Sequence, residues 1–349
     1  MAMKKKFTEE SVEEINIENG KEESPRQIEL FDKAQQERVR KQEKHSPVVF
    51  ACIIALFTLL IAALTEYYLG DPLGIFPFLE NPLQAQDATT EHVYGAVDVR
   101  VLSLDRADCS VITYSDGSCM LIDAGREQDA ATIQGQLNDL GIEKITTLVL
   151  TCASSEHIGG MSAVAGMFQV EHFICPHYPD EPESLTVLKT QLAAQGTAIE
   201  EVAILPSDRG PYEIPFTDSV SVTALSPFSG TYDSEADYSL IVRVEFGSTA
   251  MLFTGDATVN AERIAIKALH NRYFHANILM LGSHGGADSS SDKLLGTVGA
   301  QIAIASCGED GPAKSVLKQL RNYEMTLIRT DQAGNIHVRL DGENASVVE

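Results

Sequence analysis

The chain has 349 residues, of which 44% are hydrophobic, and its formal net charge is −24. This length allows one large domain or two ordinary ones, and the composition is that of a globular protein. Residues 70–349 hold sixteen Lys and Arg against thirty-eight Asp and Glu. Such an acidic body repels polyanions at long range, which argues against a nucleic acid partner, although the charge can also serve solubility alone.

The first 46 residues are polar and rich in Glu, Lys and Gln. They contain too few apolar residues to form a packed core, and the segment after Pro25 has the composition of one short helix. We predict that residues 1–46 form a mostly disordered cytoplasmic tail.

The next segment is strongly apolar. Residues 48–64, VVFACIIALFTLLIAAL, contain no charge, and Thr58 is their only polar residue. Together with residues 67–69 they reach about the twenty residues that a helix needs to cross a bilayer. We predict a single transmembrane helix over residues 47–69.

The charges around this span predict its orientation. Lys and Arg are frequent before it, and none lies between Leu64 and Arg100, which places the N-terminus in the cytoplasm and the main domain outside. A buried core helix fits poorly because the run has no polar face. A cleaved signal peptide fits poorly because about 45 residues precede the run. Residues 70–96 contain three prolines and no clear period, and they read as a linker.

Residues 97–340 alternate between strand-like and helix-like segments. Apolar or alternating runs predict strands at 97–104, 110–115, 118–123, 146–151, 172–176, 219–227, 238–247, 249–256, 276–286, 301–308 and 335–342. Amphipathic spacing predicts helices at 130–142, 161–170, 185–196, 260–274, 293–299 and 313–323. Hairpins mixed with strand–helix units predict an α/β protein with packed sheets and helices outside them.

Three of these strands end in polar residues beside glycines. Leu150 leads into TCASSEHIGG, Phe253 leads into TGDA, and Leu281 leads into GSHGG. The ends of buried strands are where α/β proteins place their chemistry, and glycine lets the backbone approach a ligand closely. We therefore expect a functional site where these ends meet.

The order of these segments resembles a known family. The chain contains SLDRADCSVITYSDGSCMLIDAG, LVLTCASSEHIGG, YSLIVRVEFGSTAMLFTGD, ANILMLGSHGGADSSS, QIAIASCGEDGP and LIRTDQAGNIHVRLDG. In this order they resemble the metallo-β-lactamase superfamily, most of all its ComEC-like branch, a domain attached to bacterial DNA-uptake channels. The resemblance covers residues 97–342. It implies a four-layer αββα sandwich over residues 97–345, with a metal site along one edge between the sheets.

The family's signature loop is Thr-His-x-His-x-Asp-His-x-Gly-Gly. Four positions match it: Thr151, His157, Gly159 and Gly160. Three positions depart from it, since Cys152 and Ser154 stand where the family has histidine, and Glu156 stands where it has aspartate.

The family's other site motifs are partly kept. Its Gly-Asp is present as Gly255 and Asp256, and its His-His-Gly becomes Ser283, His284 and Gly285. Its late His-Pro becomes Gly311-Pro312, without the histidine. By resemblance, Asp123 in LIDAG is expected to bond nearby loop backbone.

These departures affect the two metal positions differently. By resemblance, the first metal loses imidazoles at Cys152 and Ser154; serine is a poor Zn²⁺ ligand, and cysteine is a good one only as thiolate. The second position keeps two carboxylates and two imidazoles, at Glu156, His157, Asp256 and His284. We expect either no cofactor or a single divalent metal, Zn²⁺ or Mn²⁺, and no paired-metal hydrolysis.

Each candidate ligand also has a purely structural interpretation. Asp256 precedes a predicted helix and would suit its N-cap. His157 and His284 would suit ordinary hydrogen-bonded histidines at loop starts. Glu156 has the character of a solvated surface charge, and Cys152 that of a small buried hydrophobe.

Five cysteines lie after the span: Cys109, Cys119, Cys152, Cys175 and Cys307. An odd number is not a disulfide framework. If Asp116 and Gly117 form a two-residue turn, Tyr114 pairs with Cys119, which leaves Cys109 and Cys119 too far out of register for a bridge. Whether Cys152 and Cys175 pair is left open by the sequence.

Three functions follow in order of preference. The first is a membrane-anchored, extracytoplasmic, degenerate domain that is not catalytic and binds an unknown ligand or protein partner. The second is a single-metal hydrolase of phosphodiesters or other esters. The third is nucleic acid processing in DNA uptake, as the ComEC-like branch implies; the acidic charge and the single predicted span weigh against it.

Overall fold

The computed structural model describes residues 95–208 and 210–348. The tail expected over residues 1–46, the span over 47–69 and nearly all of the linker over 70–96 lie outside the described residues. Within the described part, no helix has both the length and the apolar character that membrane crossing requires.

The first sheet has eight strands in the order β15-β14-β1-β2-β3-β4-β5-β6. Their bounds are β1 Val97–Val101, β2 Ser110–Tyr114, β3 Cys119–Ile122, β4 Lys144–Val149, β5 Gln169–Pro176, β6 Ala198–Val202, β14 Ile336–Leu340 and β15 Ala345–Val348. Pairing is antiparallel from β15 to β3 and parallel from β3 to β6. Apolar runs in β4 and β5 suit this parallel part, which is covered on both faces.

The second sheet has seven strands in the order β13-β12-β11-β10-β9-β8-β7. Their bounds are β7 Tyr212–Glu213, β8 Ser221–Ala224, β9 Val242–Phe246, β10 Thr249–Phe253, β11 Ile278–Met280, β12 Ile302–Ala305 and β13 Thr326–Arg329. Pairing is antiparallel from β7 to β10 and parallel from β10 to β13. The structure is therefore an α/β fold with two mixed sheets.

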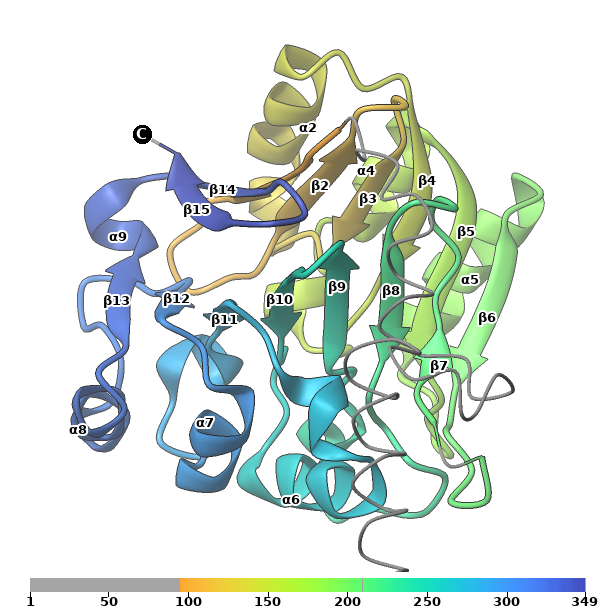
Figure 1. The fold of residues 1–349 in the computed structure, drawn as a ribbon. Helices are drawn as coiled ribbons and strands as arrows, with labels where there is room; N and C mark the ends of the chain where they lie inside the picture. Colours follow the sequence, from red (N-terminus) through yellow and green to blue (C-terminus); the bar gives the residue numbers. More distant parts are fainter. Residues whose placement is uncertain (1–94, 209, 349) are drawn as a thin grey trace, which may run out of the picture. The chain divides into compact units, whose positions relative to one another are not determined.

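Helices pack on the outer faces of both sheets (Figure 1). The helices are α2 Ala130–Asp139, α3 Ser155–Ile158, α4 Met161–Met167, α5 Glu183–Ala194, α6 Val259–Ala268, α7 Asp292–Val298, α8 Lys314–Asn322 and α9 Thr330–Ala333. Neighbouring residues of β2 face opposite sides, as the strand pleat requires. Val111 packs with α2, α4 and α5, whereas Ile112 belongs to the core that joins the two sheets with α6, α7 and α8.

The hairpin between β2 and β3 differs from the expected register by one residue. Thr113, rather than Tyr114, pairs with Cys119. The turn has three residues instead of two, because the Tyr114 N–H donates to the carbonyl of Ser118 and Gly117 takes a φ of 92°. A three-residue hairpin loop with glycine at its left-handed position is a common alternative to the two-residue turn.

The parallel strands bring the polar loops together. The carboxyl ends of β3 and β4 meet at one edge of the first sheet, and those of β10, β11 and β12 meet at one edge of the second. The two edges are joined where the Leu240 N–H donates to the carbonyl of Thr151 at 2.9 Å. The candidate site is built from the loops that leave these strand ends.

Candidate metal centre

The loop after β4 is shaped by Asp123 and Thr151. Asp123 follows β3 in a left-handed conformation with a φ of 59°. Its Oδ1 accepts a hydrogen bond from the Thr151 backbone N–H at 2.7 Å, and its Oδ2 accepts one from the Thr151 hydroxyl at 2.6 Å. Burial raises the pKa of Asp123. These bonds fix the turn that leads into α3, which carries His157.

His157 is fully buried and lies between two carboxylates. Its Nδ1 lies 2.7 Å from Oδ2 of Asp123, and its Nε2 lies 3.2 Å from Oδ1 of Asp256. Burial alone would lower the pKa of His157, but the two carboxylates hold it well above its usual value. Because Asp123 fixes one ring nitrogen, the other is directed at Asp256.

Asp256 does not cap α6, although it lies just before that helix. Thr258 caps α6 instead, since its side chain accepts hydrogen bonds from the N–H groups of Asn260 and Ala261. Asp256 Oδ2 accepts a bond from the Ser154 hydroxyl at 3.2 Å. Burial alone would raise the pKa of Asp256, but contact with His157 lowers it to about 2. Asp256 is therefore ionised at neutral pH and faces the site.

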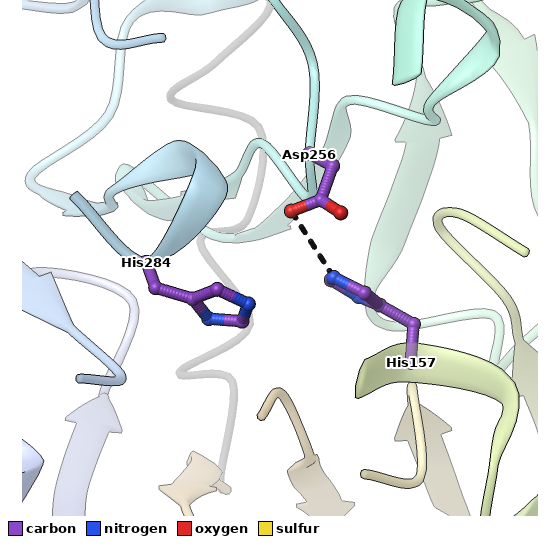
Figure 2. A group of neighbouring side chains, drawn as sticks. All are labelled: His157, Asp256 and His284. Atoms are coloured by element: carbon purple, nitrogen blue, oxygen red, sulfur yellow. Dashed lines mark ion pairs between the residues drawn. The ribbon is translucent and has the colours of Figure 1, made fainter. Parts of the chain in front are cut away.

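His284 enters the site from the loop after β11. It has a φ of 56°, which is uncommon for a residue other than glycine. Its Nδ1 lies 3.3 Å from Oδ1 of Asp108 and 3.2 Å from the Ser306 hydroxyl. Its ring stacks on that of His157 at 5.6 Å between centroids. Figure 2 shows His157, Asp256 and His284 converging from three separate segments.

The facing atoms of His157 and Asp256 fit a divalent metal. His157 Nε2 and Asp256 Oδ1 are both buried, and neither has a hydrogen-bond partner among the described residues. Their separation of 3.2 Å matches two donors on a tetrahedral ion, which lie about 3.3 Å apart when each bond is near 2.0 Å. His284 completes a group whose donor atoms all lie within 4.8 Å of one another.

A second group, Asp108, Asp123 and His157, also has its donor atoms within 4.8 Å. Here His157 Nδ1 and Asp123 Oδ2 are only 2.7 Å apart, and the same oxygen accepts the Thr151 hydroxyl. That spacing is a hydrogen bond and is too short for two ligands of one tetrahedral ion. Asp123 therefore supports His157, and the group of His157, Asp256 and His284 is the better candidate for a metal.

Comparison with known protein families shows which family the chain belongs to. A model of the metallo-beta-lactamase superfamily matches residues 103–308, which is more than half of the chain. The chain belongs to the metallo-beta-lactamase superfamily.

Two curated proteins are similar to this metallo-beta-lactamase domain. ComE operon protein 3 of Bacillus subtilis is 28% identical over 204 residues, covering 57% of this chain and 25% of that protein. Competence protein ComA of Neisseria gonorrhoeae is 26% identical over 239 residues, covering 66% of this chain and 30% of that protein. The chain thus spans less than a third of either relative.

Among solved structures, CmlA, a diiron beta-hydroxylase from Streptomyces venezuelae, is similar with a TM-score of 0.46 and 12% identity. The match covers 70% of this chain and 54% of CmlA.

The loop after β4 places Glu156 outside the candidate metal group of His157, Asp256 and His284. The Glu156 carboxylate accepts a hydrogen bond from the Ser155 hydroxyl at 2.8 Å and lies 3.8 Å from Nε of Arg126. Burial alone would raise the pKa of Glu156, but the Ser155 bond lowers it. Of the four ligands expected from sequence, the structure brings together His157, Asp256 and His284.

The remaining altered positions offer no further imidazole. Cys152 is buried, and burial raises the pKa of its thiol. Ser154 donates its hydroxyl to Asp256. Ser283 takes a φ of 50°, and a side chain at Gly311 would meet the Arg329 guanidinium. Two neutral groups therefore occupy the positions where the family's first metal has histidines.

The open question about cysteine pairing is settled within the described residues. The five cysteines after the predicted span are all free and buried. Cys152 and Cys175 do not form a bridge, although both lie near strand ends.

The glycines of the loop permit close backbone contacts. A side chain at Gly160 would overlap the carbonyl oxygen of Ala124. Gly255 has a φ of 48°, and a Cβ there would lie 2.7 Å from the Thr151 hydroxyl. Gly159 packs in the same way against the backbone of Arg126 and Glu127.

Sequence reasoning missed Asp108 and Ser306. Asp108 lies in the loop between β1 and β2, and Ser306 follows β12; both are buried. Burial alone would raise the pKa of Asp108, but the nearby His284 holds it below its usual value. The available signal was a carboxylate within the otherwise small and apolar run ADCSV.

Proposed function

We propose that this domain binds one divalent metal ion through His157, Asp256 and His284 and hydrolyses an ester or phosphodiester. The supporting observation is the buried pair of His157 Nε2 and Asp256 Oδ1, which lie 3.2 Å apart and have no hydrogen-bond partner among the described residues. Two imidazoles and one carboxylate are a donor set that suits Zn²⁺ or Mn²⁺. Three protein ligands leave a coordination position open, as catalytic zinc sites do.

The chain's own residues prepare this site. Asp123 orients His157, and Ser154 orients the carboxylate of Asp256. When bound, the metal would supply Lewis acidity and a water of lowered pKa. Because Cys152 and Ser154 provide no imidazole, the proposed chemistry uses a single metal rather than a pair.

A second candidate is a degenerate domain that binds a ligand or partner without catalysis. It is supported by the loss of the family's first-site histidines and by Glu156, which turns to Arg126 instead of the metal group. In this case the domain would keep the fold but would not catalyse hydrolysis.

The relation to competence proteins raises nucleic acid processing as a third candidate. The charge of residues 70–349, with thirty-eight acidic against sixteen basic residues, disfavours a polyanionic substrate. We therefore rank nucleic acid below a small ester or phosphodiester.

We also propose that residues 48–64 anchor the domain in a membrane and that the domain lies outside the cytoplasm. The support is the uncharged run itself and the lack of Lys and Arg between Leu64 and Arg100.

Metal analysis of the purified chain tests the main proposal. After loading with Zn²⁺ or Mn²⁺ and removal of free ion, elemental mass spectrometry should find about one metal per chain. His157→Ala, Asp256→Ala and His284→Ala should each lose it. Glu156→Ala is the matched control and should retain it, because its carboxylate faces Arg126.

Hydrolysis of bis(p-nitrophenyl) phosphate and simple esters then separates the first two candidates. Activity that is lost on chelation and restored by the metal would support the hydrolase. A chain that binds one metal but turns over no substrate would favour the binding domain. Absence of metal from every preparation would refute the proposed site.

A further inference from the structure

Asp108 contacts the metal group without belonging to it. We propose that Asp108 is a positioning residue, which holds His284 so that its far ring nitrogen faces the metal and couples it to His157. This role rests on the proposed metal site. Neither the family's signature loop nor the three converging side chains of that site include this residue.

The backbone of Asp108 is fixed where two site loops meet. Its N–H donates to the carbonyl of Glu156 at 3.1 Å, in the helix that carries His157. Its carbonyl accepts from the N–H of Gly125 at 2.8 Å, in the loop after β3. The side chain is buried, so it has one small volume in which to lie. Asp108 is thus held in place independently of His284.

The carboxylate of Asp108 reaches both imidazoles. Its Oδ1 lies 3.3 Å from Nδ1 of His284 and accepts the hydroxyl of Ser306. Its Oδ2 lies 3.9 Å from Nδ1 of His157. Both contacts are made at Nδ1, on the ring edge away from Asp256.

This arrangement fixes the tautomer of His284. An oxygen that accepts a hydrogen bond from Nδ1–H leaves Nε2 with its lone pair free for a metal. His284 needs such a partner, because its backbone is in an uncommon left-handed conformation and its loop is rich in glycine. Within the described residues, His284 Nδ1 makes a hydrogen bond with the Ser306 hydroxyl at 3.2 Å and an ion-pair contact with Asp108 Oδ1 at 3.3 Å. Ser306, which follows β12, donates its hydroxyl to the carboxylate of Asp108 and so helps to hold it.

An alternative is that Asp108 binds the metal directly, together with Asp123 and His157. The 2.7 Å contact between His157 Nδ1 and Asp123 Oδ2 argues against it, since a metal would have to break that hydrogen bond. Metal binding by Asp108→Ala and by Asp256→Ala separates the two roles.

The test measures metal affinity of the full chain by competition with a chromogenic chelator. Asp108→Ala should weaken the affinity 10–100-fold while the stoichiometry stays at about one, as is common when a carboxylate behind a ligating histidine is removed. Asp108→Asn should lose less, because its amide oxygen can still accept from Nδ1. Ser306→Ala should lose least. Asp105→Asn, an exposed carboxylate on the same loop, is the matched control and should not change the affinity.

The outcomes distinguish this inference from the proposed function. A wild-type chain that binds no metal overturns both. A wild-type chain that binds one metal, with unchanged affinity in Asp108→Ala, overturns only the role of Asp108. Metal lost in Asp108→Ala but kept in Asp256→Ala makes Asp108 a ligand and overturns the positioning role. If Asp108→Ala does not fold, Asp108→Asn and Ser306→Ala are measured instead. A metal affinity equal to that of the wild type in both variants overturns the positioning role of Asp108.

Discussion

At the scale of single residues, Gly160 determines how closely the loop after β4 packs on the loop after β3. No side chain fits there, because a Cβ would overlap the carbonyl oxygen of Ala124 in the loop after β3. Asp123, which orients His157, lies next to Ala124. Displacing this contact would therefore move both the loop and the support of His157.

Gly160→Ala should destabilise the domain by about 2 kcal/mol or more, because the overlap is with backbone that cannot give way. Gly135→Ala is the control: it lies inside α2 with open space around its Cα, so alanine should stabilise by about 0.5–1 kcal/mol. Urea unfolding of the two variants and the wild type measures both effects. Equal stability of the two variants would contradict the packing argument.

At the scale of elements, α6 and α7 are joined through one buried carboxylate. Glu262 on α6 is fully buried and accepts the N–H groups of Ser290 at 2.6 Å and Ser291 at 2.9 Å. Ser291 caps α7, and the loop before it carries His284. Glu262, on the helix that follows Asp256, therefore holds the end of the loop that carries His284.

The stability contributed by Glu262 should depend on pH. Burial raises its pKa from 4.5 to about 6, so the folded state holds a proton that the unfolded state releases. The stabilisation is fully present below pH 4.5 and is lost as the pH rises to about 6. The margin in unfolding free energy between wild type and Glu262→Gln should narrow over this range and stay level above about pH 7. Unfolding series at fixed pH values test this, and a margin that widens with pH would contradict it.

At the scale of the molecule, the described domain has a surface suited to water, whereas residues 48–64 are suited to a bilayer. The described domain buries its apolar residues in two clusters and carries few exposed large hydrophobic side chains. Residues 48–64 are uncharged and have no polar face. A run of this kind is expected in a bilayer rather than in water.

The full chain should therefore sediment with membranes and resist extraction by alkaline carbonate. A variant that lacks residues 48–64 should be recovered in the supernatant. Cys52→Ala keeps the run apolar and should behave as the wild type. Release of the wild type by carbonate would refute the anchor.

The sequence by itself determined the order of most strands and helices and the family resemblance. These depend on local apolar periodicity, on turn residues and on motif order, all of which are properties of short segments. It also predicted His157, Asp256 and His284 as ligands, because each follows a buried strand beside glycine, and the structure brings these three together as a candidate group. The membrane span, the tail and the linker lie outside the described residues and remain predictions from sequence.

Only the tertiary structure decided which side chains converge on the candidate metal site. Glu156 lies next to His157 in sequence, yet Ser155 and Arg126 hold it away from the site. Asp108 and Ser306 are 198 positions apart and meet on His284. The direction of a side chain depends on contacts between strand ends that are distant in the chain, and no local pattern records those contacts.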